Sequence, residues 1–447
     1  MPEENIIRQP AFSFCTERPN ILKKLLSLMN EPAVWPVLFL MGSVAFYPLV
    51  LFVLVTLFGF NMVSAWEMLG VPAMSIPFAD LLNVAVGIDC VEVGRDPAID
   101  SSCDPFGRVF IYPPLWLGAG KIGLSSVTLN LFAVAMAVAF FLAALAVFRA
   151  QTNGQTILYM ACLGSPPVWL GVERANTDLF LFTLLVAALY LWNTRSPVGK
   201  AFSTVLAGLG GGLKIFPIFI WPIYCRFPRR NLFYLLAFIS LFTLLVAGDW
   251  EAIRRGIAND AVKESYAFGA AVVFNRAASM FGHHNLFYLA RWGAVVLVGS
   301  FVLYLLYRQK DDLYQLVMKT DEELQNDFFL CGGLIYVGLF LTTTAYDYKL
   351  VFLFLTLPQL VLWAQGIGIP NGVRVIARLM VASTLCLFWT SSTIFFDSRL
   401  IKGGVFLFNE ALSWCVAIGL AFLVSGCVLG RLVKLIGIEE RYFRKRL

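Results

Sequence analysis

Residues 33–60 read AVWPVLFLMGSVAFYPLVLFVLVTLFGF and contain no charged side chain. A run of about 20 apolar residues is long enough to cross the hydrocarbon core of a bilayer as a helix. The run is too long for the apolar region of a secretory signal peptide, and the residues before it are of mixed polarity. We therefore expect a membrane-spanning helix here and no cleavable signal peptide.

The composition of the whole chain has the same character. Of the 447 residues, 59% are hydrophobic and only 14% are charged. A water-soluble exterior needs far more charge, so repeated apolar segments must have lipid as their solvent. We predict an all-α polytopic membrane protein of about 12 transmembrane helices. The predicted spanning or broken helices cover residues 33–60, 125–148, 156–171, 179–193, 201–213, 215–225, 231–248, 288–307, 327–345, 349–366, 375–395 and 405–432.

The distribution of charge orients these helices. Basic residues mark the cytoplasmic side of a membrane, and the first long loop is acidic, so we place that loop outside and both termini in the cytoplasm. The second long loop also carries basic residues and is an exception. The predicted cytoplasmic loops are too short to hold an enzyme, so chemistry would take place at the membrane or on its outer face. The predicted organisation is a cytoplasmic arm (1–32), a transmembrane domain (33–437) with outer loops at 61–112 and 249–287, and a basic cytoplasmic tail (438–447).

Polar segments that are far apart in the sequence converge on the predicted outer face. Charged side chains near a membrane are costly unless they are paired or hydrated, so each is a candidate functional group. We predict no comparable polar cluster at a cytoplasmic helix junction, where the charges are interpreted as membrane anchors. The converging segments are residues 80–114, residues 173–178, Lys214, the loop with His283 and His284, and the run from Tyr346 to Lys349.

Asp80 is the candidate general base. It opens the apolar stretch 81–88, which is typical of a helix lying along the membrane surface. A carboxylate at this place could accept a proton from an attacking hydroxyl, and it could equally well cap the helix. Further along the loop, residues 104–108 could fold back to the same site, where Arg108 could bind an anion.

Four polar side chains lie in the short turn at residues 173–178. Glu173 and Arg174 end one predicted helix and can pair with each other, whereas Asn176 and Asp178 open the next. Asp178 is a suitable helix cap. We favour a structural network that supports the site over a direct catalytic role for these residues.

Two lysines are candidate phosphate ligands. Lys214 follows three glycines and precedes Pro217, a pattern typical of helix ends that meet inside a membrane and line a cavity. A lysine there can hold a phosphate as a point charge, with snorkelling to the interface as the alternative. Lys349 is a second phosphate ligand unless Asp347 neutralises it.

The two histidines of the chain are adjacent, which does not favour a metal site. His283 and His284 cannot share a helix face, and no third ligand is obvious, so contact with substrate is the alternative to metal binding. The sequence has no zinc signature, no glycine-rich nucleotide loop and no nucleophile elbow. We expect no metal, no other cofactor and no nucleic-acid partner.

Cys90 and Cys103 differ from the other seven cysteines because they lie close together in the first polar loop. If that loop faces an oxidising compartment, the two thiols can form a disulfide bond. We predict this bond.

Five motifs occur in an order that resembles the GT-C glycosyltransferases of family 87, which include bacterial mannosyltransferases that use polyprenyl-phosphate-mannose. The most specific piece is the fourth motif followed by the lysine and proline of the fifth. Ala175 stands where the family usually has glycine, and the Cys90/Cys103 pair is not a general family mark. The motifs are Asp80-Leu-Leu-Asn-Val-Ala, Gly94-Arg-Asp-Pro97, Tyr112-Pro-Pro-Leu, Glu173-Arg-Ala-Asn-Thr-Asp178 and Gly212-Leu-Lys-Ile-Phe-Pro217.

The resemblance implies a GT-C-like bundle in a bacterial inner membrane, with short surface helices in the first outer loop. The donor would be a polyprenyl-phosphate-linked sugar, and the acceptor a hydroxyl group of a lipid or glycan. Asp80 would act as the base, and Lys214, with Lys349 or Arg174, would stabilise the leaving phosphate. Such a leaving group does not require a divalent metal.

Two other function classes fit the composition. A secondary transporter or lipid flippase would also use broken helices and buried charges, but it should have a site open to both faces. A non-catalytic subunit of an envelope-assembly complex is favoured if Asp80 only caps a helix.

Overall fold

A computed structural model of the chain describes residues 34–226, 231–247, 267–309, 323–366, 368–391 and 399–436, together with residues 250 and 312. The predicted arm, the basic tail and residues 251–266 of the second predicted loop lie outside the described residues.

The described chain is built almost wholly from helices, several of them 3-10 helices (η). Two short strands, β1 (Ala267–Phe268) and β2 (Ala345–Tyr346), pair antiparallel. The helices are α2 (Val34–Thr56), α3 (Met62–Met68), α4 (Ala79–Glu92), η1 (Ser101–Cys103), η2 (Pro114–Ile122), α5 (Leu129–Val147), α6 (Asn153–Leu163), α7 (Pro166–Glu173), α8 (Thr177–Trp192), α9 (Pro197–Leu213), η3 (Phe216–Tyr224), α10 (Leu232–Ala247), α12 (Val272–Phe281), α13 (His284–Arg308), α15 (Glu323–Thr342), η6 (Asp347–Leu355), α16 (Leu357–Gln365), α17 (Asn371–Thr390) and α18 (Arg399–Ile436).

Six of the described helices are long and apolar enough to cross a membrane, which makes the chain a helical polytopic membrane protein. The number rises to eight if each of two bent helix pairs counts as one span. These pairs are α7 with α8, bent by 107°, and η6 with α16, bent by 52°. The described helices thus support six to eight spans, and the count of about 12 stays a prediction.

One predicted helix is divided in two. The stretch 156–171 was expected to be continuous, but α6 ends at Leu163 and α7 begins at Pro166. Pro166 and Pro167 have no backbone N–H to donate to the preceding turn, so the first helix cannot continue through them. Both prolines fit the first turn of α7, where no such donor is needed.

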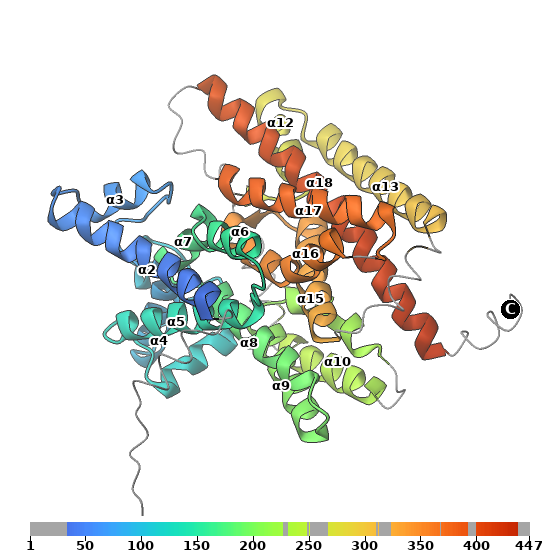
Figure 1. The fold of residues 1–447 in the computed structure, drawn as a ribbon. Helices are drawn as coiled ribbons and strands as arrows, with labels where there is room; N and C mark the ends of the chain where they lie inside the picture. The colour runs from blue at the N-terminus through green and yellow to red at the C-terminus, as the bar shows by residue number, and fades with distance from the viewer. Residues whose placement is uncertain are drawn as a thin grey trace, which may run out of the picture.

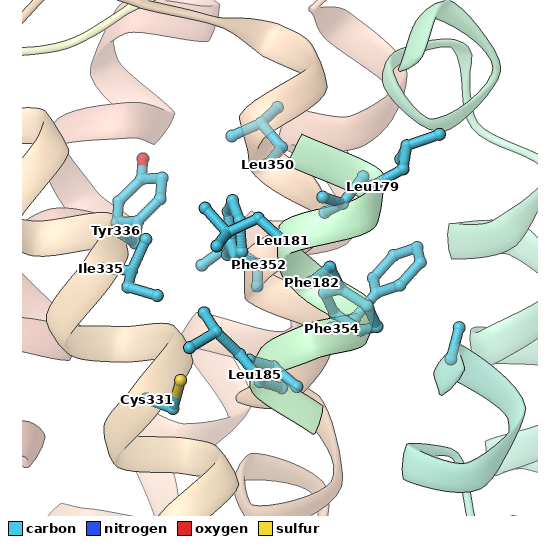
Figure 2. Packing of buried hydrophobic residues seen from close by; sticks show 14 of the residues in the cluster. Leu179, Leu181, Phe182, Leu185, Cys331, Ile335, Tyr336, Leu350, Phe352 and Phe354 are labelled. Carbon is cyan, nitrogen blue, oxygen red and sulfur yellow. The ribbon is translucent and has the colours of Figure 1, made fainter. Parts of the chain in front are cut away.

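The core is formed where α8, η6 and α15 pack against one another. Figure 2 shows Phe182 of α8 beside Phe352 and Phe354 of η6, with Ile335 of α15 facing them. All four side chains are fully buried. A Cβ atom at Gly332 would lie 2.4 Å from the carbonyl oxygen of Phe352, so glycine lets the backbone of η6 contact α15.

Helices from the two halves of the chain occupy opposite sides of this core. Figure 1 places α3 and α4 on one side, and α12 and α13 on the other, next to α18. Helix α13 is mostly exposed, as expected of a span that faces lipid. Helix α8 starts at Thr177 and ends at Trp192, and at 1.5 Å per residue its ends lie roughly 24 Å apart. The two ends of α8 carry separate polar clusters.

Candidate functional site

Asp80 lies in the first turn of α4, against the turn that joins α7 to α8. The backbone N–H of Asp80 donates to the carbonyl oxygen of Arg174 at 3.1 Å, and that of Phe78 donates to the carbonyl of Glu173 at 2.9 Å. Phe78 is the residue in the N-cap position. The backbone itself therefore docks the first polar loop onto the 173–178 turn.

The Asp80 side chain is held by groups from two distant segments. Its Oδ2 accepts a hydrogen bond from Nδ2 of Asn176 at 2.5 Å, and its Oδ1 lies 3.8 Å from Nη1 of Arg108. Both partners are side chains outside α4, and the N-cap position of that helix is held by Phe78 and not by Asp80. The side chain keeps 14% of its surface exposed.

Arg108 folds back to this site, as predicted, and is itself fixed by several bonds. Its Nη2 donates to the carbonyl oxygen of Ala79 at 2.6 Å and to Oδ2 of Asp104 at 2.8 Å. Asn83 also donates to Asp104, at 2.8 Å. Burial alone would raise the pKa of Asp104, but the hydrogen bonds from Arg108 and Asn83 outweigh it and lower that pKa below its ordinary value.

The predicted Cys90–Cys103 disulfide bond is confirmed. It joins α4 to η1, with 6.0 Å between the two Cα atoms. Because Asp104 follows Cys103 directly, the bond tethers the Asp104–Arg108 segment to the helix that carries Asp80.

Glu173 and Arg174 form the structural network expected of them. Oε2 of Glu173 pairs with Nε of Arg174 at 2.9 Å, and Oε1 accepts the backbone N–H of Met74 at 3.0 Å. Nη2 of Arg174 donates to the carbonyl oxygen of Pro72 at 3.1 Å. These bonds fasten the start of the first polar loop to the end of α7.

The cap of α8 is Asn176, so the interpretation of Asp178 as the cap is wrong. Oδ1 of Asn176 accepts the backbone N–H of Asp178 at 2.8 Å, which leaves the Asp178 carboxylate for another partner. Both are good capping residues, but only Asn176 has an amide nitrogen that can at the same time donate to Asp80.

Lys214 is the partner of Asp178. Its Nζ lies 2.8 Å from Oδ1 of Asp178, a fully buried residue, and 5.8 Å from the ring centroid of Tyr112. Lys214 follows the last residue of α9 in an extended conformation, which directs the chain into η3. An ion pair inside the bundle is inconsistent with snorkelling.

Aromatic residues around Lys214 are a feature that sequence reasoning did not single out. Nε1 of Trp116 donates to the carbonyl oxygen of Leu213 at 3.1 Å, and its ring contacts those of Tyr112 and Phe180. The Tyr112-Pro113-Pro114 sequence at the end of the polar loop was the available signal.

The run from Tyr346 to Lys349 lies beside the helix that ends at Glu173. Helix η6 packs against α7, and a Cβ atom at Gly171 would lie 3.6 Å from Cβ of Tyr348. The rings of Tyr346 and Tyr348 stack with 5.4 Å between centroids. Asp347 is only 3% exposed, and whether Lys349 neutralises it stays a prediction.

His283 and His284 are not brought to Asp80. They form the start of α13, which Figure 1 places on the other side of the bundle from α4. His284 lines a cavity of about 280 Å³ between α12 and α13, together with Arg291 and Asn275. Their predicted contact with the same substrate as Asp80 therefore has no support from the fold.

Backbone strain gathers at the Asp80 site. Among the described residues, the non-glycine residues with positive φ are Phe78, at 59°, and Ala175, at 43°. They lie on the two sides of the backbone junction between the first loop and the 173–178 turn. Strain of this kind tends to be concentrated at functional sites. The left-handed conformation of Ala175 also explains why glycine would suit that position.

A second polar cluster at the other end of α8 contradicts the prediction that none exists there. Asp327, which is fully buried, accepts from Arg226 at 3.1 Å, from Arg431 at 2.5 Å and from Asn193 at 2.8 Å. Arg226 also pairs with Glu323. Each charge lies near the end of an apolar segment and so was interpreted as an anchor. Only the packing of four segments reveals that they meet.

Comparison with known proteins does not assign this chain to a family: no family description, no curated protein and no solved structure matches it.

Proposed function

We propose that the chain is an integral membrane glycosyltransferase that moves a sugar from a polyprenyl-phosphate donor to an acceptor hydroxyl. The observation that carries the proposal is the Asp80 carboxylate, partly exposed and held by Asn176 and Arg108 from two distant segments. A buried polar network that still offers one accessible acceptor is an arrangement that suits a general base.

The reaction that fits these residues is a single displacement. Asp80 takes the proton of the acceptor hydroxyl while the oxygen of that hydroxyl attacks the anomeric carbon of the sugar. The bond from that carbon to the lipid phosphate oxygen breaks, and the phosphate leaves with the electron pair. The configuration at the anomeric carbon is inverted.

The cations of the site would stabilise the negative charge that grows on the leaving phosphate. Lys214 is paired with Asp178 but has three donor hydrogens, so it can also hold a phosphate oxygen. Arg174 and Lys349 belong to segments that flank the same turn, and Arg108 is already beside Asp80. A phosphate is a good leaving group, so the chemistry does not depend on a divalent metal.

The site also has the rigidity that catalysis needs. The disulfide bond fixes the Arg108 segment to α4, and two backbone bonds fix α4 to the 173–178 turn. Catalytic groups must be held within about half an ångström of their working geometry, and second-layer bonds of this kind hold them there.

The test is transfer of radiolabelled sugar from short-chain polyprenyl-phosphate donors, with wild type compared with Asp80→Asn. A general base contributes about 10²- to 10⁴-fold, so the variant should lose at least about 100-fold in turnover. Asp100→Asn is the matched control, because Asp100 is a carboxylate of the same loop that pairs with Arg95 at the surface. Transfer that survives Asp80→Asn would remove Asp80 as the base.

A secondary transporter or lipid flippase is the second candidate function. The Asp327 cluster favours it, because a transporter needs polar groups at both ends of the bundle. Reconstituted vesicles distinguish the two functions: a transporter moves its substrate between compartments without breaking a covalent bond, whereas the transferase releases lipid phosphate.

A further inference from the structure

A cavity between α12 and α13 is not used by the proposed transferase reaction. Its volume is about 280 Å³, and residues of both helices line it. Figure 1 places these helices on the other side of the bundle from α4, which carries Asp80. The cavity is therefore a second candidate binding site, separate from the Asp80 site.

A tight turn brings α12 and α13 together around this cavity. Helix α12 ends at Phe281, and α13 begins at His284. Between them Gly282 has a φ of 73°, a left-handed conformation that glycine adopts without steric cost. The lining residues of α13 all belong to its first eight residues, so the cavity lies at the N-terminal end of this helix.

Arg291 is the cationic side chain of the cavity. Its Nη2 donates to the carbonyl oxygen of Leu341, near the end of α15, at 3.1 Å, which fixes the side chain in place. Its Nε is buried and makes no hydrogen bond within the described residues. A buried N–H without an acceptor is costly, so an acceptor supplied by a ligand would stabilise this arrangement.

Further hydrogen-bond donors line the same cavity. The side chains of Asn275, His284 and Asn285 can each donate a hydrogen bond. The N-terminus of α13 adds a partial positive charge at this end. None of the described residues that line the cavity is acidic. The cavity therefore suits a ligand with a negative charge.

The cavity also lies at the end of a helix that faces lipid. Residues His284–Arg308 of α13 form a candidate membrane span that is mostly exposed. Tyr288 and Trp292 are exposed near its start, and such aromatic residues are enriched where a membrane meets water. Leu289 is exposed beside them. An anion in the cavity could thus carry acyl chains along the exposed face of α13.

A lipid phosphate has the chemistry that these groups recognise. The planar guanidinium of arginine matches the oxygen atoms of a phosphate, and basic pockets between membrane helices bind lipid headgroups. The volume of about 280 Å³ is several times the roughly 30 Å³ that one water molecule occupies, which leaves room for a phosphate group. A lipid with a net negative charge is favoured over a zwitterionic one, because no described lining residue is an acid that could hold an ammonium group.

We propose that α12 and α13 form a binding site for the phosphate headgroup of an anionic membrane lipid. Arg291 holds the phosphate, His284 and Asn275 donate to it, and the acyl chains lie along the exposed face of α13. The site is separate from the transferase reaction and is expected whether or not that reaction occurs.

The experiment uses the full chain, purified in an uncharged detergent and freed of lipid. Binding of radiolabelled phosphatidylglycerol is measured in mixed micelles, with unlabelled phosphatidylglycerol, phosphatidylcholine or inorganic phosphate as competitor. We expect saturable binding that only unlabelled phosphatidylglycerol displaces. Equal displacement by phosphatidylcholine would overturn the assignment of an anionic lipid, and displacement by inorganic phosphate at the same concentration would overturn the assignment of a lipid.

Arg291→Gln is the test variant, because it removes the charge that holds the phosphate. The loss of a hydrogen bond from a charged group should weaken binding of phosphatidylglycerol at least about tenfold. Arg276→Gln is the matched control. It removes the same charge from α12, but the Arg276 guanidinium lies over the ring of Phe406, 4.0 Å from its centroid, and does not line the cavity. At about 0.15 M salt it should change the affinity by less than about threefold.

If Arg291→Gln does not fold, His284→Ala gives a second test at an exposed residue. It removes one hydrogen bond and should weaken binding about two- to tenfold. The proposal is overturned if folded Arg291→Gln, or His284→Ala, binds phosphatidylglycerol as wild type does. It is also overturned if Arg276→Gln weakens binding as much as Arg291→Gln, because the lipid would then respond to net charge and not to the cavity.

Discussion

Two aspartates, Asp80 of α4 and Asp327 of α15, lie near opposite ends of α8 and have similar partners but different surroundings. Asp80 and Asp327 each bind one asparagine and at least one arginine. Asp327 is fully buried, and both of its oxygens are within hydrogen-bond distance of donors. Asp80 is partly exposed, and its Oδ1 has an arginine only at 3.8 Å. The difference separates an ion network that holds helices together from one that leaves an acceptor for chemistry.

The backbone gives the same contrast. The Asp327 cluster ties together the segments after α8 and η3 with α15 and α18, and none of its residues has a positive φ. The Asp80 cluster instead lies between Phe78 and Ala175, both in the left-handed region. Strain of this kind tends to be concentrated at functional sites, which supports the proposal that the reaction takes place at the Asp80 end.

The largest expected effect on stability comes from disrupting the Asp327 cluster. Asp327→Ala leaves two arginines without their buried counter-charge, so the free energy of unfolding should fall by about 3 to 5 kcal/mol. Unfolding in detergent, followed by heat or denaturant, measures this loss. Glu323→Ala is the control, because Glu323 is mostly exposed and its loss should change the same quantity by less than about 1 kcal/mol. Equal losses in the free energy of unfolding for Asp327→Ala and Glu323→Ala would mean that Asp327 does not hold the helices together.

The second effect tests how the Asp80 end is held. Replacing Cys90 and Cys103 by serine opens the loop, which should lower the free energy of unfolding by about 3 kcal/mol. Sugar transfer should fall further than stability alone explains, because Arg108 loses its tether to α4. Donor turnover below the unfolding temperature of the variant separates the two effects. Unchanged turnover would show that the tether does not position Arg108.

The third effect concerns Asp104 and depends on pH. Its pKa is lowered in the folded protein, so its contribution to stability is complete above the unfolded value of about 3.9 and is lost as the pH falls through the folded value. In wild type, Tm should therefore drop more steeply below about pH 4 than in Asp104→Asn. The same acid slope in both proteins would contradict the role of Asp104 as the charged partner of Arg108.

The smallest expected effect on stability tests whether Ala175 is strained. Ala175→Gly relieves a left-handed alanine but adds backbone freedom to the unfolded chain, so we expect a gain of at most about 1 kcal/mol in stability. Ala188→Gly, in the middle of α8, should instead destabilise by about 1 kcal/mol. A loss at position 175 comparable to that at 188 would mean that Ala175 is not strained.

Much of the fold could be predicted from sequence because the length of each apolar segment, and the polar residues or prolines that interrupt it, indicate where a membrane helix begins and ends. The stretch predicted at 179–193 appears as Thr177–Trp192, and that at 201–213 as Pro197–Leu213. The Cys90–Cys103 disulfide bond could also be predicted, since the two cysteines lie close together in the first polar loop.

The missed features depend on packing between distant segments. Asp327 meets Arg431 across 104 positions of sequence, and nothing local to either residue predicts the other. Asn176 and Asp178 are equally good caps, and only the position of Asp80 decides between them.

The most direct test of the whole account compares Asp80→Asn with Asp327→Asn in the same two assays, sugar transfer from a short-chain polyprenyl-phosphate donor and thermal unfolding. We predict that Asp80→Asn loses at least about 100-fold in turnover with a Tm within about 2 °C of wild type. Asp327→Asn should lose stability and, below its Tm, keep most of its turnover. Full turnover in folded Asp80→Asn, or an unfolding loss as large as that of Asp327→Asn, would contradict the assignment of chemistry to the Asp80 end.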